Sequence, residues 1–349
     1  MPKHGMLIRI ILALAAAAAA SALAATGAGA APAKRSSGSI KGAGSTFVAP
    51  LVNAWIGPAG SSLGISLSYN AVGSGGGVSA ITNKEVDFGA SDAPLSQFSP
   101  TCTTCVQIPW ALSGTSVLYN LPGVKNLLKI TGPVLAKIYL GQITHWNDPA
   151  LKKLNKGVKL PSTTITVVHR SDSSGTSFNF TDYLSRVSSA WKSKVGAGTA
   201  VAWPTGIGGK GSSGVSGLVH QTPGGIGYAD VAYSVRAGLD VFRVQNRSGQ
   251  FIIPRLKNIK AASVLDTRPA KDGSLSIVNP PKSKKYKAAY PISTYTYVDV
   301  QRNSANAAAL KKLLNWAVTK GQAYGPKLIF VPLPAPVVTF DKQQIAKVK

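Results

Sequence analysis

The chain has few of the residues that hold metal-bound or disulfide-rich folds together. Its 349 residues include 2 Cys, 4 His and a single glutamate, Glu85. A structural zinc site needs about four Cys or His ligands close together, and the histidines are scattered along the sequence. We therefore expect no metal site and no bound cofactor.

The two cysteines lie close together, in Cys102-Thr-Thr-Cys105. A Cys-x-x-Cys pair that opens a helix is typical of thioredoxin-like redox sites. Here the pair lies in a loop rich in Ser, Pro and Thr, from Leu95 to Gln107. A small-loop disulfide is the favoured interpretation, provided that the protein reaches an oxidising compartment.

Negative charge is also scarce. The chain has 38 Lys and Arg against 12 Asp and Glu, which gives a formal net charge of +26. The lysines are spread out, with the densest group between Lys282 and Lys287, and neither an RNA-binding aromatic segment nor a basic helix-turn-helix is present. We therefore expect no nucleic-acid partner. A surface adapted to an acidic exterior is the simpler hypothesis, because carboxylates lose their charge at low pH.

Long apolar runs are absent outside the N-terminal region. Positively charged residues precede the apolar run Ile10–Ala25, and the small residues Ala28-Gly-Ala-Ala31 follow it. This pattern predicts a signal peptide over residues 1–31 and export to the periplasm or the cell surface. A retained anchor is the less favoured alternative, and no cysteine near the cleavage region forms a lipobox. Export favours the disulfide between the two cysteines.

The remainder of the chain has an α/β pattern. Residues 32–38 form a polar linker, and Ile40–Ala43 and Ile65–Tyr69 read as strands with a helix, Pro50–Ile56, between them. Repeats of strand, Gly-rich loop and helix are typical of a parallel sheet covered by helices. Further helices are predicted over 77–83, 134–140, 149–154, 178–187 and 303–320, and further strands over 86–89, 107–119, 165–168 and 293–300.

Three local patterns suggest catalysis only weakly. Gly60-Ser-Ser-Leu-Gly64 matches a hydrolase nucleophile motif but precedes a predicted strand, so we interpret it as a surface loop. Gly208-Gly-Lys-Gly-Ser212 lacks the full P-loop spacing and is interpreted as a flexible loop. His169 precedes Arg170 on a strand, and since side chains alternate along a strand, it is expected to point away from the face that Arg170 uses. Asp87 is expected to be structural.

Three loop-to-helix junctions can bind an oxyanion. A strand delivers Arg170 to the Ser/Gly/Thr loop before a helix, and the segments Gly42–Phe47 and Gly73–Val78 repeat this chemistry. Helix N-termini offer free N–H groups, and glycines let the backbone approach an anion closely. Asp172 is placed to hold the guanidinium of Arg170. The candidate donors are Thr46, Phe47, Ser74, Arg170, Ser174, Gly175 and Thr176.

Asp92 lies in a nearby loop, Gly89-Ala-Ser-Asp-Ala-Pro94. A carboxylate repels an anion unless that anion carries a proton which the carboxylate accepts. Hydrogenphosphate and dihydrogenphosphate carry such a proton, whereas sulfate at ordinary pH does not. Asp92 therefore predicts selectivity for a protonated oxyanion.

These segments resemble the signature blocks of the phosphate-binding proteins of bacterial phosphate ABC transporters, the PstS family. The resemblance runs in order from about residue 40 to 340. It covers Gly42-Ala-Gly-Ser-Thr-Phe47, Gly73-Ser-Gly-Gly-Gly-Val78, 86–95, Arg170-Ser-Asp-Ser-Ser-Gly-Thr-Ser-Phe178, 138–148, 203–211 and 223–228.

The resemblance implies a two-lobed periplasmic-binding-protein fold of type II that closes on its ligand, with a mixed sheet flanked by helices in each lobe. It implies a discontinuous first lobe, 39–109 and 291–345, a second lobe, 110–290, and hinge crossovers near Pro109 and Pro291. By the family's motifs, the phosphate ligands are Thr46, Phe47, Ser74, Asp92, Arg170, Ser174, Gly175 and Thr176, with Asp172 behind Arg170. Ser45, Gly75 and Ser173 depart from residues that are common in relatives.

The implied function is high-affinity binding of inorganic phosphate and its delivery to an ABC permease, by a monomer without enzymatic activity. A secreted phosphatase on the same fold is the first alternative, but the sequence offers it neither an evident nucleophile nor metal ligands. Binding of another oxyanion, such as sulfate, molybdate or arsenate, is the second. Arsenate carries the same proton as phosphate, so Asp92 does not argue against it.

Overall fold

The computed structural model describes residues 38–124 and 127–349. The predicted signal peptide and residues 32–37 of the predicted linker lie outside this part. Within the described residues, no helix combines the length and the apolar character that a membrane crossing requires.

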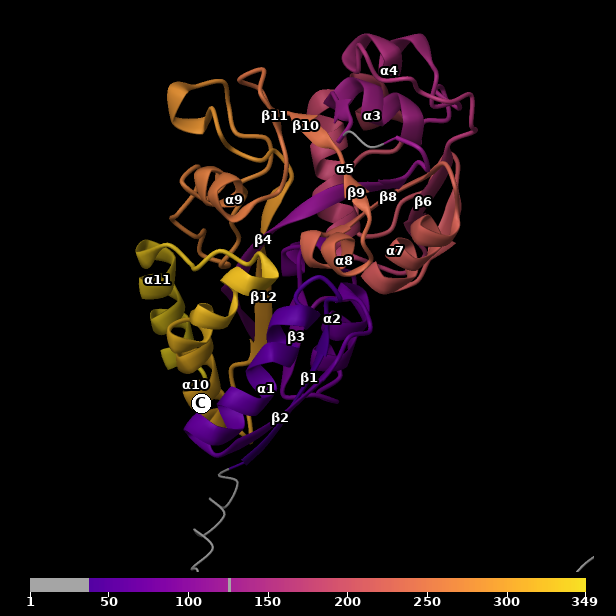
Figure 1. Cartoon of the computed structure of the whole chain (residues 1–349). Coiled ribbons are helices and arrows are strands. Elements are labelled where there is room, and N and C mark those ends of the chain that lie inside the picture. Colours follow the sequence, from indigo (N-terminus) through magenta and orange to yellow (C-terminus); the bar gives the residue numbers. More distant parts are fainter. Residues whose placement is uncertain (1–37, 125–126) are drawn as a thin grey trace, which may run out of the picture. The chain divides into compact units, whose positions relative to one another are not determined.

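One long strand, β4 (Cys105–Asn120), organises the sheet, and every residue of it except the last is buried (Figure 1). Up to Gly114 it pairs antiparallel with β12 (Ser293–Gln301), and from Thr115 it pairs antiparallel with β8 (Gly225–Asp230). The predicted mixed sheets of the two lobes are therefore joined through β4 into one path, in the order β2-β1-β3-β12-β4-β8-β6-β7.

The strands on either side of β4 are mostly parallel to their neighbours, as the predicted strand–helix repeats require. β1 (Gly38–Gly44), β2 (Ile65–Asn70) and β3 (Phe88–Ser91) extend the β12 side, and β6 (Thr166–Arg170) and β7 (Ile207–Gly209) extend the β8 side. β9 (Asp240–Val241) also pairs with β4, and β5 (Lys129–Ile130), β10 (Arg243–Gln245) and β11 (Phe251–Ile252) form a small separate sheet.

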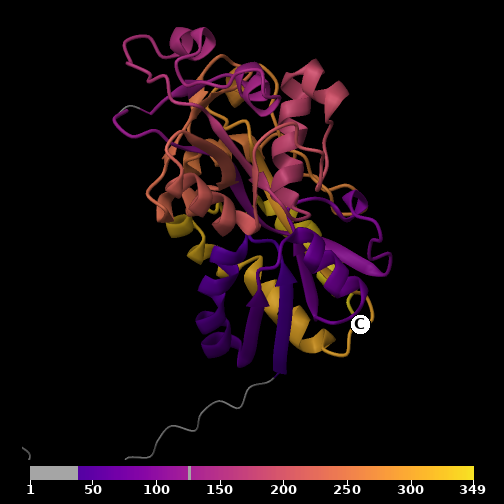
Figure 2. The same cartoon turned by 90° about the vertical axis from the view of Figure 1, so that its right-hand side faces the viewer.

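The two largest buried cores define two lobes. Trp55 packs edge-on against Trp110 and Trp316 in the first, with ring centroids 5.2 and 6.2 Å away. Phe180 stacks on Tyr228 at 4.3 Å in the second. The first lobe contains the helices α1 (Ala49–Leu63), α2 (Ser74–Thr82), α10 (Ala307–Ala317) and α11 (Ala335–Ala346) (Figures 1 and 2). The second lobe contains α3 (Gly132–Tyr139), α4 (Pro149–Leu154), α5 (Gly175–Val187), α6 (Ser189–Lys194), α7 (Gly211–Gln221) and α8 (Val231–Arg236).

The assignment of residues to the two cores does not follow the predicted lobe boundaries. Within 110–290, the segment that holds α9 (Leu256–Ser263) contributes Ile259, Leu275 and Ile277 to the first core, and only from Val278 does the chain rejoin the second. The strand partner of β4 changes at Gly114, beyond Pro109. Pro109 instead lies next to a bulge in β4 itself, where Trp110 is an extra residue between the partners of Thr296 and Tyr297. Proline in a sheet is typical of such positions.

Two segments interpreted as loops are regular structure. Gly60–Leu63 form the last turn of α1, and Gly64 ends that helix with a φ of 68°, which glycine adopts easily. Gly208 and Gly209 belong to β7, and Gly211 and Ser212 begin α7. Their glycine content suggested flexibility, but pairing of β7 with β6 overrides it. A disulfide joins Cys102 and Cys105.

Candidate anion-binding site

The predicted oxyanion loops converge at the carboxyl ends of parallel strands. β1 and β3 run parallel, and Ser45 and Asp92 follow their last residues. In the second lobe β6 ends at Arg170, shortly before α5 begins. Ligands of α/β proteins bind at such strand ends, where loops and helix N-termini meet.

Arg170 is the buried cation of the site, with 3% of its surface exposed. Its Nε and Nη2 donate to the two carboxylate oxygens of Asp172 at 2.7 and 2.5 Å. Its Nη1 points at Thr176 Oγ1, 3.5 Å away. Burial raises the pKa of Asp172, but the hydrogen bonds and charge of Arg170 outweigh this effect and leave the pKa below its usual value. Asp172 therefore stays ionised and fixes the guanidinium plane.

Asp92 is the buried carboxylate of the site and is 2% exposed. Its Oδ1 accepts the Ser45 hydroxyl at 2.5 Å, and its Oδ2 accepts the Thr176 hydroxyl at 3.1 Å. Burial raises its pKa to about 6, although these two hydroxyls and the charge of Arg170 act in the opposite direction. Sequence reasoning missed Ser45, although it lies inside the quoted block Gly42–Phe47.

Thr46 connects the site to the start of α7. Its Oγ1 accepts the backbone N–H of Ser212 at 3.0 Å and lies 3.0 Å from the Ser212 hydroxyl. Its carbonyl oxygen accepts the Tyr233 hydroxyl at 2.7 Å. Gly211 donates its N–H to Asp172 Oδ1 at 3.1 Å. Gly211 and Ser212 were missed because the segment Gly208–Ser212 was interpreted as a flexible loop. The sequence signal for them was a Gly-Ser pair at the start of a helix.

The N-terminus of α5 lies against the Asp92 loop. Ser174 caps the helix by accepting the N–H of Ser177 at 3.1 Å, so the N–H groups of Gly175 and Thr176 are the remaining donors of the first turn. A Cβ on Gly175 would lie 2.6 Å from the backbone nitrogens of both Asp92 and Ala93. Only glycine permits this approach of the helix to the loop.

The other two predicted donors also lie here. Ser74 begins α2, and its hydroxyl accepts the N–H of Asp92 at 3.4 Å. Phe47 donates its N–H to Ser45 Oγ at 3.0 Å, and its ring is fully buried in the first core. The Phe47 N–H is thus already engaged by the hydroxyl that binds Asp92.

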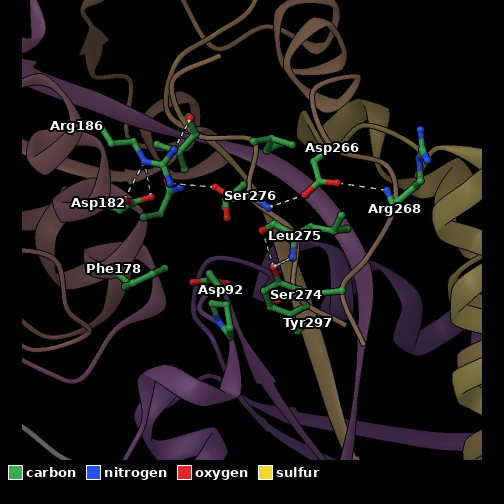
Figure 3. Close-up of a pocket in the computed structure, with 16 residues that line it drawn as sticks. Asp92, Phe178, Asp182, Arg186, Asp266, Arg268, Ser274, Leu275, Ser276 and Tyr297 are labelled. Carbon is green, nitrogen blue, oxygen red and sulfur yellow. Dashed lines mark hydrogen bonds and ion pairs between the residues drawn. The ribbon is translucent and has the colours of Figure 1, made fainter. Parts of the chain in front are cut away.

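A cavity of about 370 Å³ ends at Asp92 (Figure 3). Phe178 and Asp182 of α5 line one side of it, and the segment around Ser276 lines another. Arg186 bridges the two sides, since its Nε donates to Asp182 at 2.9 Å and its Nη2 donates to Ser276 Oγ at 3.1 Å. The cavity adds polar groups beside the site, and two of its charged side chains, Arg186 and Asp182, pair with each other.

The residues expected to be structural lie away from the anion loops. His169 stacks on Trp203 with ring centroids 4.9 Å apart, and burial lowers its pKa. Asp87 accepts the Lys41 N–H and the Asn306 amide, each at 2.7 Å. No group of three or more His, Cys, Asp or Glu side chains among the described residues is arranged to hold a metal ion.

Comparison with known proteins identifies the family. A family model for the PBP superfamily domain matches residues 29–320. The phosphate-binding protein PstS of Xylella fastidiosa is 40% identical over 314 residues, which cover 88% of this chain and 85% of the relative. PstS of Haemophilus influenzae is 39% identical over 88% of this chain and 92% of its own length. The chain belongs to the PstS family.

Solved structures of more distant proteins have the same fold. The high-affinity periplasmic phosphate-binding protein PfluDING, solved with phosphate, superposes with a TM-score of 0.68 at 20% identity, covering 87% of this chain and 93% of that one. The PstS family member described here therefore has the periplasmic-binding-protein fold that its sequence blocks predicted.

Proposed function

We propose that this PstS family member binds inorganic phosphate outside the cytoplasm and delivers it to an ABC permease. One observation supports this most directly: the Thr176 hydroxyl lies between the Arg170 guanidinium and the Asp92 carboxylate. An anion bound beside it meets a positive donor and a carboxylate at once. A protonated tetrahedral oxyanion satisfies both, because its oxygens accept from Arg170 and its hydroxyl donates to Asp92.

The proposed contacts come from both lobes. The hydroxyls and N–H groups of the loops donate to phosphate oxygens, Arg170 adds charge, and Asp92 accepts the phosphate hydroxyl. The proposed phosphate ligands are Thr46, Phe47, Ser74, Asp92, Arg170, Ser174, Gly175 and Thr176. Binding of the ion between the lobes removes it from water, and docking on the permease releases it. This role includes no covalent chemistry, and we propose a monomeric, exported protein with a signal peptide over 1–31.

Selectivity for phosphate over sulfate is the first testable consequence. An unpaired buried carboxylate costs about 1–3 kcal/mol, which is roughly one to two decades in affinity. In isothermal titration calorimetry at pH 7.5, we expect phosphate to bind with a dissociation constant of about 1 μM or lower, near −8 kcal/mol. Sulfate at about ten times the phosphate dissociation constant should weaken the apparent phosphate affinity by no more than about twofold.

The variant Asp92→Asn tests the cause of this selectivity. We expect the variant to bind phosphate more weakly. The ratio of its phosphate affinity to its sulfate affinity should fall by about tenfold or more. Asp182→Asn, in the cavity beside Asp92, is the matched control and should leave the ratio unchanged. Equal competition by sulfate in the wild-type protein would refute the role given to Asp92, and arsenate, which also has a proton, should compete with phosphate.

Gly175 gives an independent test of the contact between α5 and the Asp92 loop. In Gly175→Ala the added Cβ would lie 2.6 Å from two backbone nitrogens, so the helix and the loop must move apart. We expect phosphate affinity to fall about tenfold or more, about 1.4 kcal/mol, measured by the same calorimetry. Gly217→Ala in α7 is the control, because its Cβ meets no atom within 4 Å. An affinity loss of the same size in both variants would contradict this expectation.

The alternative of a secreted phosphatase is tested separately. It predicts release of p-nitrophenol from p-nitrophenyl phosphate by the purified protein. Phosphate binding without such release supports the transport role, whereas turnover would overturn it.

A further inference from the structure

A second, strongly basic cavity lies in the second lobe, outside the anion loops. Its volume is about 440 Å³. Four cationic residues line it: Lys129, Lys153, Lys156 and Arg243. None of its lining residues is an aspartate or glutamate. A concave surface with charge of one sign attracts and concentrates ions of the opposite sign.

The four cations come from separate elements that the fold brings together. Lys129 is on β5, Arg243 is on β10, Lys153 is in the last turn of α4, and Lys156 follows that helix. Arg243 is the register partner of Lys129 in the parallel β10–β5 pair. Like charges directly opposite each other in a sheet are destabilising. The pairing of Lys129 with Arg243 is therefore not explained by a contribution to the stability of the fold.

Neighbouring groups relieve this repulsion only slightly. The Lys129 ammonium lies 5.5 Å from the centre of the Phe251 ring, a weak cation–π contact at an exposed position. Asp148, the carboxylate on α4, caps the opposite end of that helix through the Ala150 N–H at 2.8 Å. Asp240 on β9 does not line the cavity either. Neither ion pair found in the described part of the chain involves any of these four cations, so their charge is available to a bound anion.

Asn155 holds the lining elements in a fixed arrangement. This side chain is 6% exposed, and its Oδ1 accepts the Lys129 N–H at 2.7 Å. Its Nδ2 donates to the Lys129 carbonyl and to the Leu151 carbonyl, each at 3.0 Å. The end of α4 is therefore anchored to β5, and the cationic side chains begin from a rigid base. Preorganisation of this kind lowers the entropic cost of binding an ion.

We propose that this cavity binds a short linear oligophosphate, with inorganic tripolyphosphate as its probe. Lysine ammonium groups are compact, strongly hydrated charges suited to phosphate oxygens. Three ammonium groups and the Arg243 guanidinium around one cavity match an anion with several negative charges better than a single phosphate ion. The cavity shares no residue with the Arg170 site, and the proposal does not depend on phosphate binding there.

Calorimetry with the phosphate-saturated protein tests this second site. Inorganic phosphate at millimolar concentration occupies the Arg170 site, and tripolyphosphate is then titrated at low salt. We expect binding with a stoichiometry near one, and an affinity that falls steeply as salt rises. The tripolyphosphate affinity of the double variant Lys153→Gln/Lys156→Gln should be lower by about tenfold or more, about 1.4 kcal/mol. Lys192→Gln/Lys194→Gln removes two exposed lysines at the end of α6, another short helix, and should stay within about twofold of wild type.

Several results would overturn the proposal. They are the absence of tripolyphosphate binding up to millimolar concentration, equal losses in the two double variants, and equally tight binding of a single-stranded oligonucleotide of the same charge. The phosphate affinity of both double variants should equal that of the wild type. Failure of phosphate binding in every protein would contradict the transport role but would leave the tripolyphosphate result interpretable.

Discussion

Replacement of Arg170 by alanine is expected to weaken phosphate binding about a thousandfold. Arg170 is 3% exposed and is the buried cation beside Asp92 and Thr176. Truncation of one partner in a buried, hydrogen-bonded charge pair costs about 2–5 kcal/mol, and about 4 kcal/mol corresponds to a factor of roughly a thousand. The variant also leaves Asp172 without its partner, which adds a second negative charge next to the anion. Titration calorimetry on the purified variant measures the loss.

Arg186→Ala is the matched control for this loss. Arg186 is also an arginine held by an aspartate, Asp182, but its side chain is 42% exposed and lies in the neighbouring cavity. An exposed ion pair contributes little, so phosphate affinity should change by less than about threefold. His169→Ala should also change it little, because His169 stacks on Trp203. A folded Arg170→Ala protein that binds phosphate within tenfold of wild type would contradict the proposed site.

Asp341 on α11 is expected to make the protein less stable as the pH rises. Its side chain is fully buried, and neither carboxyl oxygen has a hydrogen-bond partner among the described residues. Burial raises its pKa from 3.8 to about 9. Because the folded pKa lies above the unfolded value, the folded state binds the extra proton. The contribution of Asp341 to the free energy of unfolding is therefore fully present below about pH 4 and is lost progressively between about pH 4 and 9.

The variant Asp341→Asn should remove this pH dependence. One pH unit corresponds to about 1.4 kcal/mol, so the wild type loses about 4 kcal/mol between pH 4 and pH 7 through this residue. We expect the variant to melt on the order of 10 °C higher at pH 7, and to match the wild type near pH 4. Thermal unfolding followed by circular dichroism across this pH range measures both. Glu85→Gln, at an exposed position, is the control and should follow the wild type.

Other buried carboxyl groups add to this pH dependence. Burial also raises the pKa of Asp230 and Asp299, and neither oxygen of Asp299 has a partner among the described residues. Together with Asp92 and Asp341, four of the 12 acidic residues are fully or almost fully buried. Buried carboxyl groups with a raised pKa, such as Asp299 and Asp341, stabilise the fold most at low pH, where they are protonated. This agrees with the hypothesis that its lysine-rich surface is adapted to an acidic exterior.

The anion loops could be predicted from the sequence because their signals are local. The glycines and hydroxyls of Gly42–Phe47, Gly73–Val78 and the loop after Arg170 each precede a helix, and the carboxyl ends of parallel strands meet at one edge. Asp172 is two residues from its partner Arg170, so their pairing needed no knowledge of the fold.

Long-range contacts were the part that the sequence could not predict. The Ser45–Asp92 and Thr46–Ser212 contacts join residues 47 and 166 positions apart. The segment around α9 has few apolar residues, and only the packing of Ile259, Leu275 and Ile277 against the first core assigns it. In Gly208–Ser212 the glycine content suggested a loop, whereas pairing with β6 makes part of it a strand.

The continuous strand β4 also bears on how the protein can be divided. Nine of its first ten residues pair with β12 and its last six pair with β8, so each lobe depends on the same strand. A fragment that ends near Gly114 would leave β3 and the first part of β4 without β12, and a fragment that begins there would leave β12 without both of these strands. Unpaired apolar edges promote aggregation. The two lobes should therefore fail to fold as separately expressed pieces, although each has a core of its own.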